Sequence, residues 1–125
     1  MIVNAPVSVG ELVDKITILE IKKEFFTDNK KIENVQVELK HLKEALPETE
    51  DIFNEFYSLY IVNKKLWQIE DDIRKKEKLK EFDQEFIELA RSVYYTNDIR
   101  AELKREINKK VGSTLIEEKQ YDDYK

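Results

Sequence analysis

The chain of 125 residues has the size of one compact domain, because two domains would each be left with too small a core. Hydrophobic residues at 41% are close to the globular average, while 39% charged residues with only two Gly and two Pro indicate long amphipathic helices. A net charge of -5 excludes the basic footprint of a general nucleic-acid binder. Zero Cys and one His exclude disulfide scaffolds, Cys/His zinc sites and thiol catalysis, and we expect neither a metal nor a cofactor.

The first predicted helix covers 9–26 and begins with a capping box made by Ser8 and Glu11. The second covers 29–46, where apolar residues alternate at steps of three and four until a proline ends the pattern.

The third predicted helix covers 50–79 and shows the same alternation before it fades into a solvated charged run. The fourth covers 84–111, with Asp83 as its N-cap and Gly112 just after its end.

A tail, 113–125, follows the glycine stop, where chain ends usually fray. Its aliphatic and tyrosine side chains predict partial docking, with Ser113 to Ile116 packed on the helices. The last residues should be ordered only if Tyr121 or Tyr124 finds a pocket.

Short breaks between these segments predict a single all-α domain, an antiparallel bundle of four helices with the two longer ones at the C-terminal end. The longer pair should project beyond the shorter pair and bury its excess against a second copy. The aromatic stripe Phe53, Tyr57, Tyr60 and Trp67 offers a further apolar face. We therefore predict a homodimer.

Polar residues interrupt the apolar stripes of three predicted helices. They are expected to converge on one interior region, and they are Glu20, Lys23, Asn63, Glu70, Asn97, Arg100 and Lys104. Buried charges must be paired, hydrated or in contact with a ligand. One interpretation is a structural ion-pair network. The other is a binding site in which Arg100 and Lys104 hold a carboxylate or phosphate, with Glu20 or Glu70 available for proton transfer.

Other motifs give weaker signals. The Glu38 and His41 step of di-metal bundles needs a second copy that a chain with one His cannot supply. The Glu85 and Glu88 pair is similar to nucleotide pyrophosphohydrolases, but the downstream metal-binding pair is missing. The first helix has the acid-hydrophobic rhythm of chorismate-mutase-type enzymes, yet Lys23 stands where an interior arginine would be needed.

Four segments together carry a family resemblance: APVSVGELVDKITILEIK from Ala5, LWQIEDDIR from Leu66, YTNDIRAELKREIN from Tyr95 and GSTLIEEKQYDDY from Gly112. They resemble a family of short all-helical bacterial proteins of unknown function. The resemblance implies a cytoplasmic protein associated with genes for glycosyltransferases and cell-surface polysaccharides. It supplies no active-site residue.

Our leading hypothesis is a binding or accessory protein that holds an anionic small molecule or a partner segment at the interior polar region. A small enzyme acting on an anionic substrate and a purely structural dimer are the alternatives. No apolar run of about 18 residues and no basic leader followed by an apolar run occur, so we expect a cytoplasmic protein without membrane or nucleic-acid partners.

Overall fold

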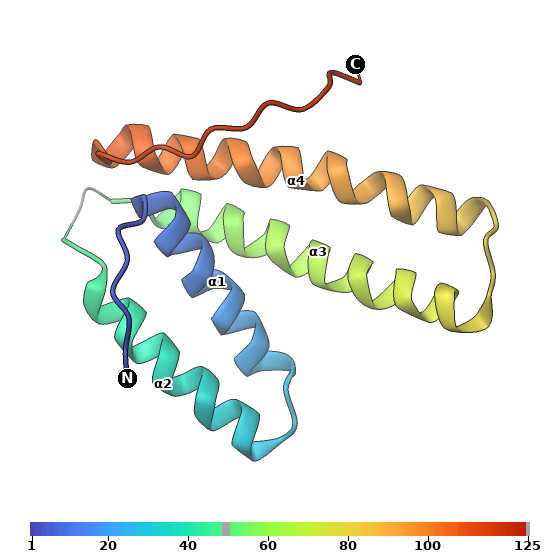
Figure 1. Cartoon of the computed structure of the whole chain (residues 1–125), viewed down its shortest axis with the longest axis horizontal. Coiled ribbons are helices and arrows are strands. Elements are labelled where there is room, and N and C mark those ends of the chain that lie inside the picture. The colour runs from blue at the N-terminus through green and yellow to red at the C-terminus, as the bar shows by residue number, and fades with distance from the viewer. Residues whose placement is uncertain (49–50, 125) are drawn as a thin grey trace.

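Four α-helices form the regular structure in the computed structural model, which describes residues 1–48 and 51–124. They are α1 (Val9–Phe25), α2 (Asn29–Ala45), α3 (Phe53–Leu79) and α4 (Gln84–Val111), and no strand occurs in the described ranges (Figure 1). The predicted all-α class is confirmed. The third helix begins at Phe53 rather than near 50, a position outside the described residues, and the other bounds lie within one residue of those predicted.

Side-chain caps explain where three of the helices begin. The Ser8 hydroxyl accepts from the Glu11 amide at 3.1 Å, and the Asp83 carboxylate accepts from the Phe86 amide at 3.0 Å. Asp28 caps α2 in the same way. Gly112 ends α4 with φ at 66°, a left-handed conformation that glycine adopts without steric cost.

The helices form two antiparallel hairpins, and α1 is the helix that packs against all three others (Figure 1). One face of α1 packs on α2 in a cluster formed by Leu12, Ile16, Leu19, Val35 and Leu39. The other face packs between α3 and α4, where Val13, Leu59 and Ile107 are fully buried. Because α1 is buried on two sides, some of its polar residues are also buried. The apolar stripe in the sequence does not indicate this.

The α3–α4 hairpin projects beyond the shorter pair, as the helix lengths predict (Figure 1). At its far end the Lys76 amino group bridges Glu81 and Asp83 at 3.0 Å each, which fastens the turn between the helices. No helix in the described ranges is long and apolar enough to cross a membrane.

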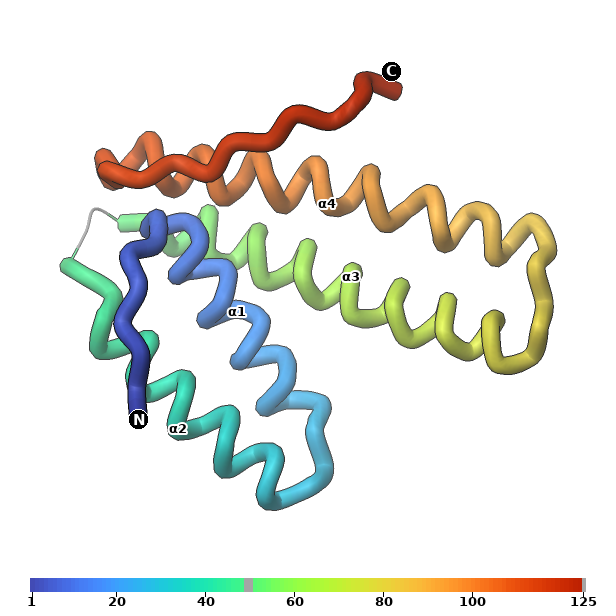
Figure 2. Tube along the Cα trace, viewed as in Figure 1, coloured from blue at the N-terminus to red at the C-terminus, as the bar shows by residue number. Residues whose placement is uncertain are grey.

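The tail runs back along α4 without regular structure from residue 113 to 124 (Figure 2). Its start is held by Ser113, whose hydroxyl accepts from the Val9 amide at 3.2 Å. The ring of Tyr124 lies 5.0 Å from those of Tyr94 and Tyr95, and its hydroxyl donates to Asp98. Tyr124 thus finds the contact on which ordering of the last residues was predicted to depend. Packing of the first tail residues is weaker than predicted, because Leu115 is 44% exposed.

Candidate functional site

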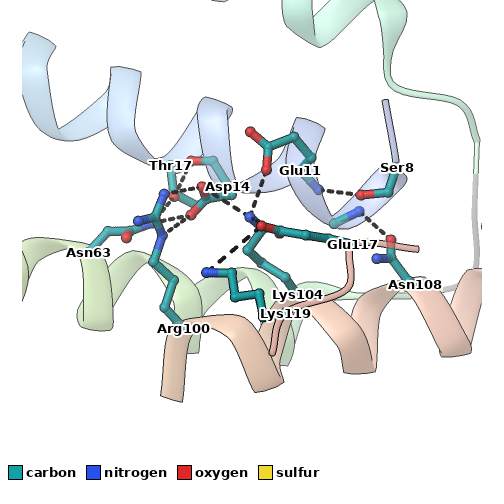
Figure 3. A network of polar contacts seen from close by, with 11 residues as sticks. Ser8, Glu11, Asp14, Thr17, Asn63, Arg100, Lys104, Asn108, Glu117 and Lys119 are labelled. Atoms are coloured by element: carbon teal, nitrogen blue, oxygen red, sulfur yellow. Dashed lines mark hydrogen bonds and ion pairs between the residues drawn. The ribbon is translucent and has the colours of Figure 1, made fainter. Parts of the chain in front are cut away.

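A buried carboxylate lies at the centre of the polar region between α1, α3 and α4 (Figure 3). Asp14 of α1 is 1% exposed and accepts hydrogen bonds from Arg100 Nε and from the Asn63 amide, both at 2.9 Å. Arg100 Nη2 donates to the other carboxylate oxygen, so the arginine binds in the bidentate manner. This arrangement satisfies a charge that would be costly if left unpaired.

Small residues on α1 allow this close packing. The Gly10 amide donates to the Asn108 side chain at 2.6 Å, and a Cβ at Gly10 would lie 2.5 Å from the Lys104 carbonyl oxygen. Two turns along, the Thr17 hydroxyl accepts from the side-chain amide of Asn63 at 2.8 Å. The face made by Gly10, Asp14 and Thr17 therefore brings α1 against α4 and aims the carboxylate at α3 and α4.

Lys104 of α4 lies beside the pair of Asp14 and Arg100 and is 6% exposed. Together with Asn63, Glu11 and Glu117, these residues form what we call the polar cluster. Its amino group lies 2.6 Å from Glu11 of α1 and 2.6 Å from Glu117 of the tail, and 4.0 Å from Asp14 (Figure 3). The predicted capping box is therefore only half formed: Ser8 caps the helix, but the Glu11 side chain turns to the lysine instead of back to the cap. An ion pair with a charge-assisted hydrogen bond stabilises that carboxylate more than a hydrogen bond to a neutral backbone amide would.

Arg100, Lys104 and Glu117 are all in their charged forms at neutral pH. Hydrogen bonding to Asp14 raises the pKa of Arg100. Burial opposes the charge on Lys104, but hydrogen bonds to Glu11 and Glu117 outweigh it and raise the pKa of that amine. The hydrogen bond from Lys104 lowers the pKa of Glu117. All three shifts favour the charged form of the side chain. None of them moves a pKa toward pH 7, as a proton donor or acceptor at neutral pH would need.

Of the seven residues predicted to converge, the structure brings three together: Asn63, Arg100 and Lys104. Asn97 lies half-buried one turn before Arg100 and makes no hydrogen bond to a described residue of the cluster. Glu70 is exposed and pairs with Arg74 at 3.1 Å along α3. The predicted convergence is therefore wrong for Glu70, because that part of α3 extends past the end of α1.

Glu20 and Lys23 lie elsewhere, in a cleft of about 470 Å³ between α1 and the start of α3. The Glu20 carboxylate pairs with Lys43 of α2 at 2.7 Å. The predicted convergence of Glu20 with Arg100 and Lys104 is thus wrong, because the side chain faces α2. Trp67 of the predicted aromatic stripe stacks on Phe25 of α1, with ring centroids 5.8 Å apart.

Acid should release the tail, and this pH dependence is a testable consequence of the Lys104 to Glu117 ion pair. Because the docked carboxylate has a pKa below its ordinary value of 4.5, docking is at full strength above about that pH and is lost as the pH falls through the docked value. Lys104, Arg100 and Lys119 all face this carboxylate. The raised pKa values of Lys104 and Arg100 keep both of these groups protonated throughout this range.

Backbone amide NMR shifts of the tail measured from pH 7 to pH 3 check this expectation. A Glu117→Gln chain should show no such transition, and far-UV circular dichroism should show that the helices persist. A tail that stays docked at pH 3 would contradict the assignment.

No group of three or more His, Asp or Glu side chains in the described ranges is arranged to hold a metal ion. His41 and Glu38, whose spacing is that of a di-metal step, are both exposed on α2.

Comparison with known proteins gives a family and no function. Searches among curated proteins and among solved structures found no match to the chain. A sequence profile described as a family of unknown function, DUF6165, matches residues 3–124, nearly the whole chain. The chain belongs to the DUF6165 family.

Proposed function

We propose that this chain is a non-catalytic binding protein, and that the polar cluster holds a carboxylate carried by a partner segment. The observation that carries the proposal is the Lys104 amino group, which binds Glu117 of an irregular tail at 2.6 Å although it is almost buried. A buried ammonium that accepts a carboxylate from outside the helical core is a recognition element for acidic segments. The tail serves as the example of such a segment.

A segment is favoured over an anionic small molecule by what already lies at the site. Glu117, whose carboxylate reaches Lys104, is carried by an irregular stretch of chain that runs along α4. The arrangement therefore shows how a carboxylate on an extended chain is received there. Surface-glycan assembly is the setting that we propose for this binding, on the basis of the family resemblance alone.

The enzyme alternative has less support. It needs Glu20 or Glu70 beside Arg100 and Lys104 as a proton donor or acceptor. Glu20 pairs with Lys43, and Glu70 pairs with Arg74 in solvent. The two carboxylates that do lie at the cluster in the helical core, Glu11 and Asp14, are committed to ion pairs.

The test uses a full-length chain with Glu117→Gln and Tyr124→Ala, called the open variant, which removes the two side-chain anchors that hold the tail on α4 and keeps the contact of Ser113 with α1. It is titrated with a fluorescent peptide of residues 113–124, and anisotropy reports binding. We expect saturable binding that becomes at least about tenfold weaker when the peptide itself carries Glu117→Gln, because a hydrogen bond to a charged group contributes about 1.5 to 3 kcal/mol.

Lys104→Met in the open variant should remove binding, whereas Lys109→Met, an exposed lysine on the same helix, should leave it unchanged. Circular dichroism confirms that each variant is folded. Equal binding of the two peptides, or no binding to the folded open variant, would refute the proposal.

We also propose that the chain forms a homodimer through a patch on α3 made by Phe53, Tyr57 and Ile61. These side chains follow one ridge at steps of four and are 69%, 57% and 46% exposed. A second copy of the same ridge would bury them, because neighbouring helices pack through such rows.

Sedimentation velocity at micromolar concentration checks the dimer, which should have twice the 15.0 kDa chain mass. Tyr57→Lys should shift the chain to monomer, while Val37→Lys on the outer face of α2, 55% exposed, should not. A monomeric wild-type chain would count against this assembly.

A further inference from the structure

The tail contacts α4 at separate points, and two of these contacts are made by side chains of the tail. Glu117 binds Lys104 in the middle of the tail, and Tyr124 near its end packs on Tyr94 and Tyr95 and donates to Asp98. The strip of α4 that lies under the tail between these anchors, which we call the groove, has a cation at one end and a tyrosine pair with a carboxylate at the other.

The stretches between the anchors bury little surface. Leu115 and Ile116 are 44% and 48% exposed, and Tyr121 is 80% exposed. Each residue that is ordered loses backbone conformational entropy. A segment held by so few contacts therefore detaches far more easily than the helices unfold. The tail can therefore leave α4 while α1, α3 and α4 remain packed.

The groove keeps its recognition groups when the tail leaves. Lys104 is positioned by Glu11 and its own helix, and Asp14 with Arg100 lies behind it. Tyr94 and Tyr95 contact each other with ring centroids 4.9 Å apart, independently of Tyr124. An extended segment of the same chemistry would meet a preformed surface.

We propose that the tail is an intramolecular competitor for this groove, and that the partner segment is an extended one carrying a carboxylate and, further along the chain, a tyrosine. The inference rests on the proposed function of the polar cluster and adds its specificity and its regulation. The groove is closed while the tail is docked, and the partner segment gains access only when the tail is displaced. An attached tail competes strongly, since a short tether gives an effective concentration of about millimolar.

The experiment compares the wild-type chain with the open variant in binding the same fluorescent peptide of residues 113–124. The wild-type chain should bind the peptide at least tenfold more weakly, because its own tail fills the groove. A full-length chain with Tyr124→Ala alone should bind with intermediate affinity. Its matched control is Tyr121→Ala, which removes a largely exposed ring from the tail and should behave as the wild-type chain does.

Each outcome bears on the inference separately from the proposed function. If the peptide binds the wild-type chain and the open variant equally well, competition by the tail is refuted while carboxylate binding stands. If Tyr121→Ala opens the groove as much as Tyr124→Ala, the tyrosine specificity is refuted. If the folded open variant binds no peptide, the proposed function falls and the inference falls with it.

Discussion

Replacing Asp14 with alanine is expected to lower the free energy of unfolding by about 3 to 5 kcal/mol, because it leaves buried positive charge without its partner. Arg100 would lose both of its hydrogen bonds to the carboxylate, and Asn63 would lose one. Asp14 itself is 1% exposed, so water cannot replace what is removed without opening the contact between α1 and α4. Urea denaturation followed by circular dichroism measures the loss.

Glu70→Ala is the matched control, because it removes a carboxylate whose ion pair is exposed to solvent. Its side chain is 56% exposed, and such a pair contributes about 0 to 1 kcal/mol. If Asp14→Ala cost no more than this control, Arg100 and Lys104 would have to be hydrated in the folded chain. That result would contradict the buried cluster.

Gly10→Ala is expected to destabilise the fold by about 2 to 3 kcal/mol. The added methyl group would lie 2.5 Å from the Lys104 carbonyl oxygen and 3.0 Å from Asn108 Oδ1. Because the first of these atoms belongs to the backbone of α4, the helices must separate to make room. The hydrogen bond from the Gly10 amide to Asn108 would weaken as they do.

Gly112→Ala separates this steric effect from the general effect of replacing a glycine. Nothing lies within 4 Å of a Cβ at Gly112, so only its left-handed backbone, with φ at 66°, is strained by a side chain. We expect a cost of about 1 kcal/mol. Thermal unfolding of the two variants compares them, and a Gly10→Ala chain no less stable than Gly112→Ala would show that α1 and α4 are not in close contact.

The helices could be predicted because their signals are local. Ser8 and Asp83 cap the helices that they were expected to cap, and the glycine stop after α4 adopts the left-handed conformation. Local signals do not fix how the two hairpins cross. The position of α1 between α2 and the longer hairpin depends on packing between residues far apart in sequence.

The cations of the site could be predicted, but most of their partners could not. Arg100 and Lys104 stand out because long charged side chains occupy core steps of α4. Asp14 was not predicted, because the apolar stripe of α1 indicates where its hydrophobic side chains are buried and does not indicate a buried carboxylate beside them. The signal for its second buried face was the run of small and polar residues at Gly10, Asp14 and Thr17.

The acids that were expected to pair with these cations fail for a geometric reason. Helix α1 diverges from α4 along its length, so Glu20 reaches Lys43 of α2 rather than Lys104. Glu70 lies on the projecting part of α3, where water solvates the carboxylate. Glu117 belongs to the tail. The sequence of the tail has no periodicity from which its path along α4 could be predicted.

The central claim, that Lys104 holds the carboxylate of the tail, is tested most directly by the ¹⁵N heteronuclear NOE of the amides of residues 114–124. In the wild-type chain we expect these values to approach those of α4, and in a Glu117→Gln chain we expect the values around position 117 to fall to those of a flexible chain end. A tail that is equally flexible in both chains, or equally rigid in both, would contradict the account.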